Sequence, residues 1–330
     1  MKTISITDIP GIKLGQYENA EAATGVTVII APDGMAAGID VRGGGPASRD
    51  TRTLDPLANA EFIHAVVLGG GSAFGLDAGG GVMRYLEERG IGLPVGTVHV
   101  PLVCQSDIFD LLVGDANVRP DGEMGYAACV AAETGNYRNG NFGVGCGASV
   151  GKILGAEFAM KSGIGSYAVQ VGDLMVGAIV AVNAIGNIIN PATGKTVAGL
   201  LTEDKKGFRS TTEALTQLYE NEQAQAMSEA HAVTNTTIGA IITNANLTKG
   251  QLSKLAGMAH DGYARTISPV HTSMDGDSIY GLSVGGVDAP IDVVGSIAAE
   301  VMAEAILVAV RSAQSAYGLP AACDLEWDEI

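Results

Sequence analysis

The stretch Asn235-Thr-Thr-Ile-Gly-Ala-Ile-Ile242 places two hydroxyl residues after an asparagine and directly before an apolar run. The β-branched residues of this run predict a strand over Thr237–Thr243. If the Asn235–Thr236 bond were cleaved, Thr236 would carry a free α-amine beside its hydroxyl. Because an α-amine has a pKa of about 8, one residue would then supply both a nucleophile and a base. By itself, an Asn-Thr pair before an apolar run is more typical of a turn that leads into a strand.

Composition and charge exclude several classes of protein. The chain has 330 residues, of which 47% are hydrophobic, so it can bury a large core. A net charge of −17 argues against binding to nucleic acid, which needs clustered Lys and Arg. Apolar stretches such as Ile297–Val310 are interrupted by Glu300 and Glu304, so we expect no membrane span. The start of the chain lacks the features of a secretory signal, and we therefore expect a cytoplasmic protein.

The cysteines and glycines point to different features. The four cysteines are far apart and have no histidine at metal-ligand spacing, so we expect reduced thiols, no disulfide, no metal and no cofactor. Glycine is abundant, with 46 residues, and forms runs that permit tight turns and close backbone approach. These runs are Gly43–Gly45, Gly69–Gly71 and Gly79–Gly81.

Strand and helix signals alternate irregularly along the chain, which favours sheets covered by helices over a regular βαβ repeat. Thr248 and Gln251 form a capping box at the start of one predicted helix. The polar segment Glu203–His231 indicates an exposed approach to Asn235 or an ordinary surface helix. Strands are predicted over Gly25–Ile30, Ala36–Val41, His64–Leu68, Val98–Val103, Val176–Val182, Thr237–Thr243 and Ile279–Val284, and helices over Ala73–Arg89, Gly122–Glu133, Thr211–His231, Thr248–His260 and Asp292–Ser312.

Two aspartates, Asp275 and Asp277, stand two residues apart before a predicted strand. An extended backbone would place both carboxylates on one face, where they could hold a cationic amine. An Asp-Gly turn explains the same residues without chemistry. The residue order of a calcium loop is missing.

Lys152 and Asn183 are further candidates. The glycine-rich segment Gly143–Lys152 resembles a phosphate loop, but Cys146 replaces a required glycine and Ile153 replaces the Ser/Thr that would meet magnesium. Lys152 is therefore either a cation near an active site or a solvated lysine. Asn183 ends an apolar strand, where its amide could donate to an oxyanion or simply begin a turn.

The histidines give no support to a familiar catalytic triad. His64 and His99 lie in apolar strands and are expected in the core, while His260 and His271 have no accompanying Ser or Cys motif. The Gly-x-Ser-x-Gly motif of hydrolases is also absent from the sequence.

An ordered set of segments resembles the L-aminopeptidase/D-esterase family, which includes β-peptidyl aminopeptidases and the nylon-oligomer hydrolase. The resemblance spans nearly the whole chain. The matching segments are Ile6–Gly15, Thr24–Val28, Val41–Gly45, His64–Asp77, Ile108–Leu111, Gly147–Lys152, Val182–Asn183, Asn235–Ile238, Thr243–Ala245 and Met274–Asp277.

The resemblance implies an α+β fold, a four-layer αββα sandwich similar to the N-terminal-nucleophile hydrolases. It implies a single catalytic domain, 1–330, that cuts itself between Asn235 and Thr236 into an α chain, 1–235, and a β chain, 236–330. Thr236 would be the nucleophile of both self-cleavage and catalysis. Thr236 is favoured over Thr237 because Thr243-Asn-Ala245 then falls at the family's spacing.

The resemblance also assigns roles to the other candidates. Asn183 matches an oxyanion-hole asparagine, Asp275 and Asp277 match positions that orient the nucleophile and its amine, and Lys152 matches a lysine of the nylon-hydrolase branch. Phe109 stands where several members have a Tyr, so a role for that hydroxyl is in doubt. Asp277 replaces the Glu of the β-peptide-cleaving branch, which leaves the recognition of the amine open.

The leading hypothesis is a hydrolase of small peptides, β-peptides or related amides. The resemblance implies a homo-oligomer, a tetramer or similar, of α/β heterodimers. One alternative is an acyltransferase of the ornithine acetyltransferase type, although the usual Ala-Thr-Met context of its threonine is absent. Another alternative is an uncleaved, non-catalytic binding protein.

Overall fold

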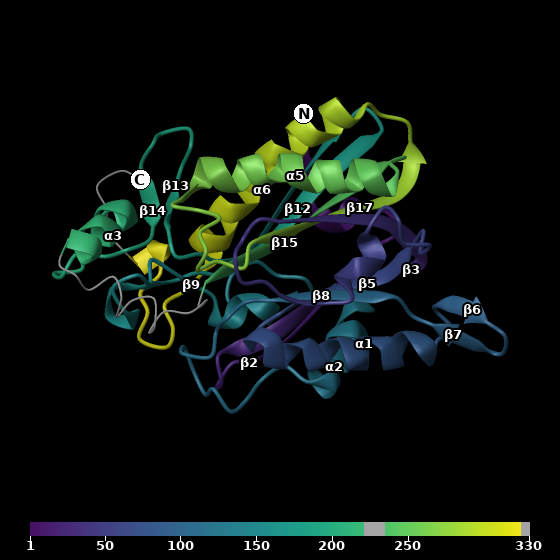
Figure 1. The fold of residues 1–330 in the computed structure, drawn as a ribbon, viewed down its shortest axis with the longest axis horizontal. Coiled ribbons are helices and arrows are strands. Elements are labelled where there is room, and N and C mark those ends of the chain that lie inside the picture. The colour runs from purple at the N-terminus through teal and green to yellow at the C-terminus, as the bar shows by residue number, and fades with distance from the viewer. Residues whose placement is uncertain (221–234, 325–330) are drawn as a thin grey trace.

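The fold consists of two packed sheets with helices on both outer faces, as a computed structural model of residues 1–220 and 235–324 shows (Figure 1). The 18-residue strand β3 (Thr24–Val41) belongs to both sheets. The first sheet has the order β1 (Lys2–Ile4), β11 (Ile164–Val171), β12 (Leu174–Asn183), β15 (Thr236–Ala245), β17 (Ser278–Val287) and the second part of β3. The second contains β2 (Lys13–Asn19), the first part of β3, β5 (Ile63–Gly69), β8 (Val103–Asp107) and β4 (Ala47–Arg49).

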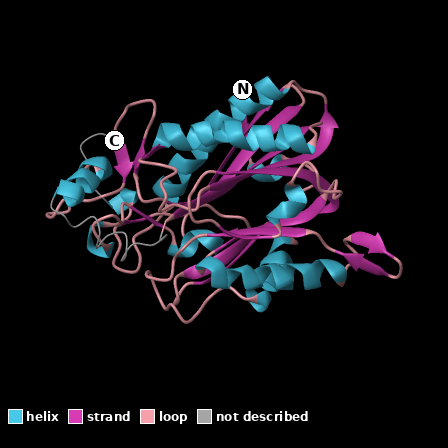
Figure 2. Ribbon diagram, in the orientation of Figure 1, coloured by secondary structure: helices cyan, strands magenta, loops and turns pink. Residues whose placement is uncertain are grey.

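Four long helices cover the two outer faces, as Figure 2 shows. Helices α5 (Lys249–Thr266) and α6 (Ile291–Ser312) pack on the first sheet, and α1 (Ala78–Glu87) and α2 (Gly122–Ala132) lie against the second. Separate clusters of buried apolar residues fill the three spaces between the four layers. The predicted α+β four-layer αββα sandwich is therefore confirmed.

Strand β3 changes sheets at a break in its hydrogen-bond ladder. Its first part pairs with β5 through Ile30, the register then shifts before Met35, and its last residues pair with β17. Between these points Pro32 has no N–H to donate, and Gly34 adopts a φ of +83° that side chains disfavour. One strand can thus bend from one sheet into the other.

Each sheet contains one parallel pair joined by a helix. Strands β15 and β17 are parallel and connected through α5, which begins with the predicted capping box of Thr248 and Gln251. Strands β5 and β8 are parallel and connected through α1. Parallel neighbours need such crossovers whereas antiparallel neighbours do not, so helices fall between only some of the strands. The smaller elements are β6 (Leu93–Val95), β7 (Val98–Val100), β9 (Ser149–Val150), β10 (Met160–Lys161), β13 (Asn187–Ile189), β14 (Thr196–Ala198), β16 (Ile267–Ser268), α3 (Thr211–Glu220) and 3-10 turns η1 (Ile6–Asp8), η2 (Thr51–Leu54), η3 (Ser72–Asp77), η4 (Gly143–Gly147), η5 (Ala156–Phe158) and η6 (Ala322–Asp324).

Several predicted elements differ in extent from the observed ones, and the helix expected over Thr248–His260 continues to Thr266. The strand expected over Val98–Val103 is divided between β7 and β8, because Pro101 cannot donate to a ladder. β7 instead forms a projecting hairpin with β6, so His99 is exposed and not in the core (Figure 1). The helix expected from Ala73 begins at Ala78, after the 3-10 turn η3.

The helix expected over Thr211–His231 is seen as α3 as far as Glu220, and its remainder lies outside the described residues. Helix α6 is long and apolar enough to cross a membrane by length and composition alone. However, 72% of its most apolar 18-residue window is buried inside the protein, as in the core helix of a globular domain.

The glycine runs allow backbone segments to approach closely, as predicted. A Cβ atom on Gly43 would lie 2.2 Å from the backbone nitrogen of Asp277, and one on Gly70 would lie 2.0 Å from Oδ2 of Asp110. A Cβ atom on Gly81 would lie 1.7 Å from the carbonyl oxygen of Gly122, where α1 meets α2. Each run therefore sits at a packing contact that no larger residue permits.

Candidate active site

Thr236 is the first residue of β15 and is only 3% exposed. Its cross-strand partner in β12 is Asn183, and Asn235 forms a parallel bridge with Asp275. The Thr236 hydroxyl donates a hydrogen bond to the carbonyl oxygen of Asn235. The side chain of the predicted nucleophile thus lies against the peptide group that self-cleavage would attack.

The same carbonyl oxygen accepts a second hydrogen bond, from the backbone N–H of Gly276 at 3.0 Å. This donor can stabilise negative charge that develops on the Asn235 oxygen. A Cβ atom on Gly276 would lie 2.8 Å from the Thr236 hydroxyl and 2.8 Å from the Gly45 carbonyl oxygen. The sequence does not reveal the role of Gly276, because a backbone donor leaves no side-chain signal; Asp275-Gly-Asp277 predicts only a turn.

Asn183 ends β12, fully buried, with an amide held in one orientation. Its Oδ1 accepts hydrogen bonds from the Ser149 backbone N–H at 3.1 Å and from Nζ of Lys152 at 2.7 Å. Its Nδ2 donates to the carbonyl oxygen of Phe109 at 3.0 Å. Because an amide nitrogen carries two hydrogens, the second can serve a further acceptor, as an oxyanion donor must.

Lys152 is directed toward Asn183 and is not a solvated surface lysine. Its Nζ also donates to the Asn183 carbonyl oxygen at 3.1 Å. Burial of the ammonium lowers the pKa of Lys152 to about 7, although the negative charges of Asp275 and Asp110 oppose that shift. This amine therefore exchanges protons near neutral pH.

Asp277 fixes the residue that follows the nucleophile. Its Oδ1 accepts from the Thr237 N–H at 2.8 Å, and its Oδ2 accepts from the His271 N–H at 3.1 Å. Burial, followed by the charge of Asp275, raises the pKa of Asp277 to about 8. The carboxyl group is thus mostly protonated at neutral pH.

Asp275 connects the same loop to the end of β12. Its Oδ2 accepts from the hydroxyl of Thr272 at 2.5 Å, and its Oδ1 accepts from the Ile185 N–H at 3.4 Å. Burial raises the pKa of Asp275, while the Thr272 bond and the charge of Lys152 lower it. In the described part of the chain neither Asp275 nor Asp277 hydrogen-bonds Thr236 directly, so both act through the backbone around it.

A pair of histidines packs next to the loop that carries Asp275 and Asp277. Nδ1 of His260 and Nε2 of His271 lie 2.9 Å apart, and Nε2 of His260 lies 3.2 Å from the carbonyl oxygen of Asp40. His271 in turn donates its backbone N–H to Asp277. These two histidines therefore have a structural connection to the site. His64, in contrast, is buried and accepts from the Leu102 N–H.

A pocket of about 170 Å³ opens beside Asn183. Its polar end is formed by Ser149 and Lys152, both of which hydrogen-bond the Asn183 side chain. Phe109 also lines the pocket, and its carbonyl oxygen accepts from Asn183. The rest of the lining is largely apolar and includes Leu112, Val113, Ala156, Ala159 and Leu319.

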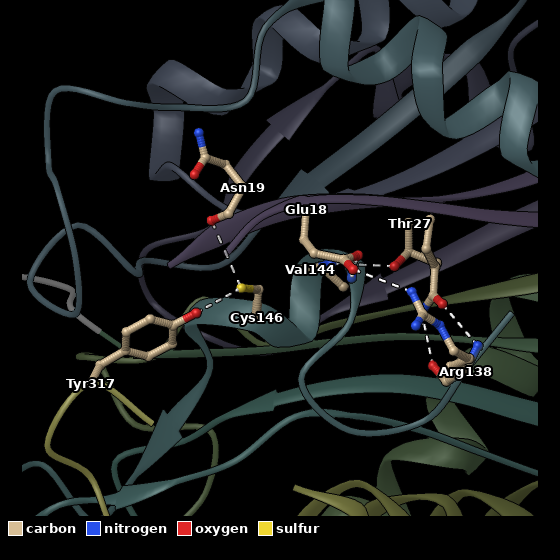
Figure 3. A network of polar contacts seen from close by, with 9 residues as sticks. Glu18, Asn19, Thr27, Arg138, Val144, Cys146 and Tyr317 are labelled. Carbon is tan, nitrogen blue, oxygen red and sulfur yellow. Dashed lines mark hydrogen bonds and ion pairs between the residues drawn. The ribbon is translucent and has the colours of Figure 1, made fainter. Parts of the chain in front are cut away.

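The turn η4, which precedes Ser149, is held at its N-terminal end by a polar network (Figure 3). Glu18 accepts from the Gly143 N–H at 2.8 Å and pairs with Arg138 at 3.3 Å. The Val144 N–H donates to the hydroxyl of Thr27 at 3.3 Å. A carboxylate at the N–H end of a turn satisfies groups that have no partner within the turn.

At its other end the turn meets the buried lysine Lys161. Its Nζ donates to the carbonyl oxygens of Gly145 at 2.9 Å, Ala148 at 3.0 Å and Ser162 at 2.5 Å. Burial lowers the pKa of Lys161 to about 7. The segment that carries Ser149 and Lys152 is thus fixed from both ends.

Comparison with known proteins gives the family. Residues 5–322 match the sequence model of Peptidase family S58. The chain belongs to Peptidase family S58. An uncharacterized aminopeptidase of Mycobacterium bovis is 38% identical to this S58 protein over 349 residues, which cover 97% of each chain. A 6-aminohexanoate-oligomer endohydrolase of Paenarthrobacter ureafaciens is 32% identical over 315 residues, which cover 92% of this chain and 84% of the relative.

Solved structures confirm the fold of this S58 protein. An L-aminopeptidase D-Ala-esterase/amidase from Ochrobactrum anthropi, described as a variant among the Ntn hydrolase fold, superimposes with a TM-score of 0.68 at 19% identity over 94% of this chain and 86% of the other. A β-aminopeptidase from Burkholderia sp. gives a TM-score of 0.66 at 21% identity over 98% and 94%. The predicted family resemblance is confirmed, and the S58 protein is an amide or peptide hydrolase.

Proposed function

We propose that this S58 protein cleaves its own Asn235–Thr236 bond and then uses the N-terminal Thr236 to hydrolyse small peptides or related amides. The observation that carries the proposal is the buried contact between the Thr236 hydroxyl and the Asn235 carbonyl group. The Gly276 N–H on the same oxygen supports it, because that donor lies where the charge of a tetrahedral intermediate would develop.

Self-cleavage proceeds by an acyl shift followed by hydrolysis. The Thr236 oxygen attacks the Asn235 carbonyl carbon, its proton passes to the Thr236 nitrogen, and the C–N bond breaks to leave an ester. Water then adds its hydroxyl to the Asn235 acyl group and returns a proton to the Thr236 oxygen. The products are a carboxylate on Asn235 and a free amine on Thr236.

The freed amine then acts as the general base for substrate. It takes the hydroxyl proton as the Thr236 oxygen attacks an amide carbonyl, and it returns that proton to the leaving amine. The second hydrogen of the Asn183 amide stabilises the oxyanion, while Lys152 and the Ser149 N–H keep that amide oriented. Water then hydrolyses the acyl-enzyme.

The pocket beside Asn183 supports a small, apolar acyl group in the substrate. Its volume of about 170 Å³ and its largely apolar lining leave little room for a long or charged chain. The carboxyl groups of Asp275 and Asp277 lie near the start of β15, and their oxygens, as hydrogen-bond acceptors, support recognition of an amine. Small peptides, β-peptides and other short amides with a free amino end meet both conditions.

The test combines mass spectrometry and N-terminal sequencing of purified protein with turnover of an amide panel. We expect two fragments, 1–235 and 236–330, and net hydrolysis. Thr236→Ala is expected to give one intact chain without amidase activity, because it removes the hydroxyl. An intact wild-type chain, together with full activity in Thr236→Ala, would refute the proposal.

Thr237→Val is the matched control. The Thr237 hydroxyl is buried next to the nucleophile and has no hydrogen-bond partner among the described residues. Valine has nearly the same shape, so this variant is expected to cleave and to hydrolyse substrate like the wild type. Acetyl transfer to an amino acid acceptor without net hydrolysis would instead support an acyltransferase.

A further inference from the structure

We propose that Asp110 is a positioning residue that sets the orientation of the Asn183 amide through the peptide group between Phe109 and Asp110. This inference rests on the proposed function, because it concerns the oxyanion donor of that site. Asp110 is 3% exposed and makes no hydrogen bond to Asn183 itself in the described part of the chain. Its effect therefore has to pass through the backbone.

The Asp110 carboxylate joins two separate segments of the second sheet. Its Oδ1 accepts from the Gly71 N–H at 2.7 Å, and its Oδ2 accepts from the hydroxyl of Thr24 at 2.7 Å. Thr24 begins β3, and Gly71 follows β5. The Gly71 N–H can only donate and the Thr24 hydroxyl donates here, so the two acceptor oxygens of the carboxylate satisfy both groups.

Two glycines make room for this carboxylate. A Cβ atom on Gly70 would lie 2.0 Å from the Asp110 Oδ2, and one on Gly147 would lie 2.6 Å from the Asp110 Cβ. Gly147 also ends the turn η4 that leads to Ser149. Glycines from two motifs that are far apart in the sequence thus enclose the same aspartate, which explains why neither position tolerates a side chain.

The connection to Asn183 is the planar peptide group that follows Phe109. The Phe109 carbonyl oxygen accepts from Nδ2 of Asn183 at 3.0 Å, and it lies in the same plane as the backbone nitrogen of Asp110. On the preceding side, the Ile108 N–H donates to the Gly69 carbonyl oxygen at 2.8 Å. With Ile108 and the Asp110 side chain both anchored, the direction of the Phe109 carbonyl group is fixed, and with it the amide it holds.

Asp107 provides a matched contrast three residues earlier. It is also a buried aspartate, but its Oδ1 accepts from Gln105 at 2.8 Å and its Oδ2 has no partner in the described part of the chain. Burial raises the pKa of Asp107 well above its usual value. Neither oxygen touches the peptide group after Phe109.

The experiment measures kcat, KM and the extent of self-cleavage for Asp110→Asn on a short amide substrate. Asparagine keeps the size of the side chain but loses the charge, so the bond from the Gly71 N–H weakens and the Thr24 hydroxyl has to accept from Nδ2 instead of donating. We expect kcat to fall at least about 10-fold and KM to change less than about threefold, because an oxyanion donor acts in the transition state. Asp107→Asn, a near-isosteric change that leaves the contacts of Asp110 with Thr24 and Gly71 intact, is expected to keep both constants.

A second pair of variants applies if Asp110→Asn fails to fold. Thr24→Val removes one donor to Asp110 and retains the shape, whereas Thr24→Ser retains the hydroxyl. We expect kcat to fall in Thr24→Val and to recover in Thr24→Ser. Wild-type kcat in Asp110→Asn or Thr24→Val, an equal loss in Asp107→Asn, or no recovery in Thr24→Ser would overturn the inference. A wild-type chain that neither cleaves nor hydrolyses amides would instead overturn the proposed function.

Discussion

The two sides of the candidate site use burial in opposite ways. The amide side, formed by Ser149, Lys152 and Asn183, contains a buried ammonium group whose pKa is lowered to about 7. The carboxylate side, formed by His271, Asp275 and Asp277, contains a carboxyl group whose pKa is raised to about 8. Loss of water is the largest cause on both sides.

This difference shows how the site can hold both an acid and a base near neutrality. Burial disfavours any charge, so it weakens the lysine as a cation and the aspartate as an anion, and the two pKa values come close together. The contacts differ as well. The amide side holds a side-chain donor in place, whereas the carboxylate side binds backbone N–H groups near Thr236. We therefore expect the amide side to affect the chemical step more strongly.

The largest effect is expected from Asn183→Ala on the amide side. It removes the oxyanion donor and one acceptor of Lys152, so we expect kcat to fall about 100-fold or more. The control is Asn187→Ala, because Asn187 is also a buried asparagine but its amide contacts Leu200 and Arg209 instead of the site. Steady-state kinetics on a short amide would contradict the assignment if both variants lost activity equally.

A smaller effect is expected from Asp277→Asn on the carboxylate side. Asparagine can still accept from the Thr237 N–H, but its amino group would face the His271 N–H, so one hydrogen bond is lost. We expect kcat to fall only about 10-fold at neutral pH, because Asp277 is already mostly protonated there and the substitution removes little charge. A loss larger than that of Asn183→Ala would reverse the comparison between the two sides.

The smallest effect concerns the pH dependence of stability beneath the carboxylate side. Burial lowers the pKa values of His260 and His271 to about 4 from the ordinary 6.5. Between about pH 4 and 6.5 the unfolded chain therefore binds more protons than the folded chain. The stability that the two neutral histidines contribute is thus fully present above about pH 6.5. It is lost as the pH falls toward 4.

The measurement is urea unfolding of the wild type and His271→Gln between pH 4 and 7. Asp277 titrates with the opposite sign, since its raised pKa means that stability is lost as pH rises toward 8. The difference between the two proteins isolates the histidine. We expect the stability advantage of the wild type to shrink as the pH falls. His99→Gln, on the exposed hairpin, should follow the wild type, and a constant difference for His271→Gln would contradict the expectation.

Sequence patterns predicted local structure well where the physical signal is local. The capping box at Thr248 depends on residues three apart, and β15 depends on a continuous β-branched run, so both were found. The strand expected through Pro101 was wrong because hydrophobicity outweighed the missing N–H in the prediction. The early start expected for α1 was wrong because the chain first forms the 3-10 turn η3.

The candidate site was predictable only in part. Ordered motifs pointed to Thr236, Asn183 and Lys152, and the structure brings the last two into direct contact. The roles of the Gly276 N–H and the Phe109 carbonyl oxygen could not be predicted, because every residue has such groups. Asp110 lies in the matching segment Ile108–Leu111, but its contacts with Thr24 and Gly71 could not be predicted from that motif.

Residue order alone predicts a strand that begins at a hydroxyl residue after Asn235, an acidic chain with a large core, and an ordered set of glycine motifs. Local residue spacing carries this information. Folding of the whole chain is needed to place Asn183 across from Thr236 and to bring the Gly276 N–H to the Asn235 carbonyl oxygen. These contacts depend on strand register and loop packing, which bring residues more than 30 positions apart to within hydrogen-bond distance.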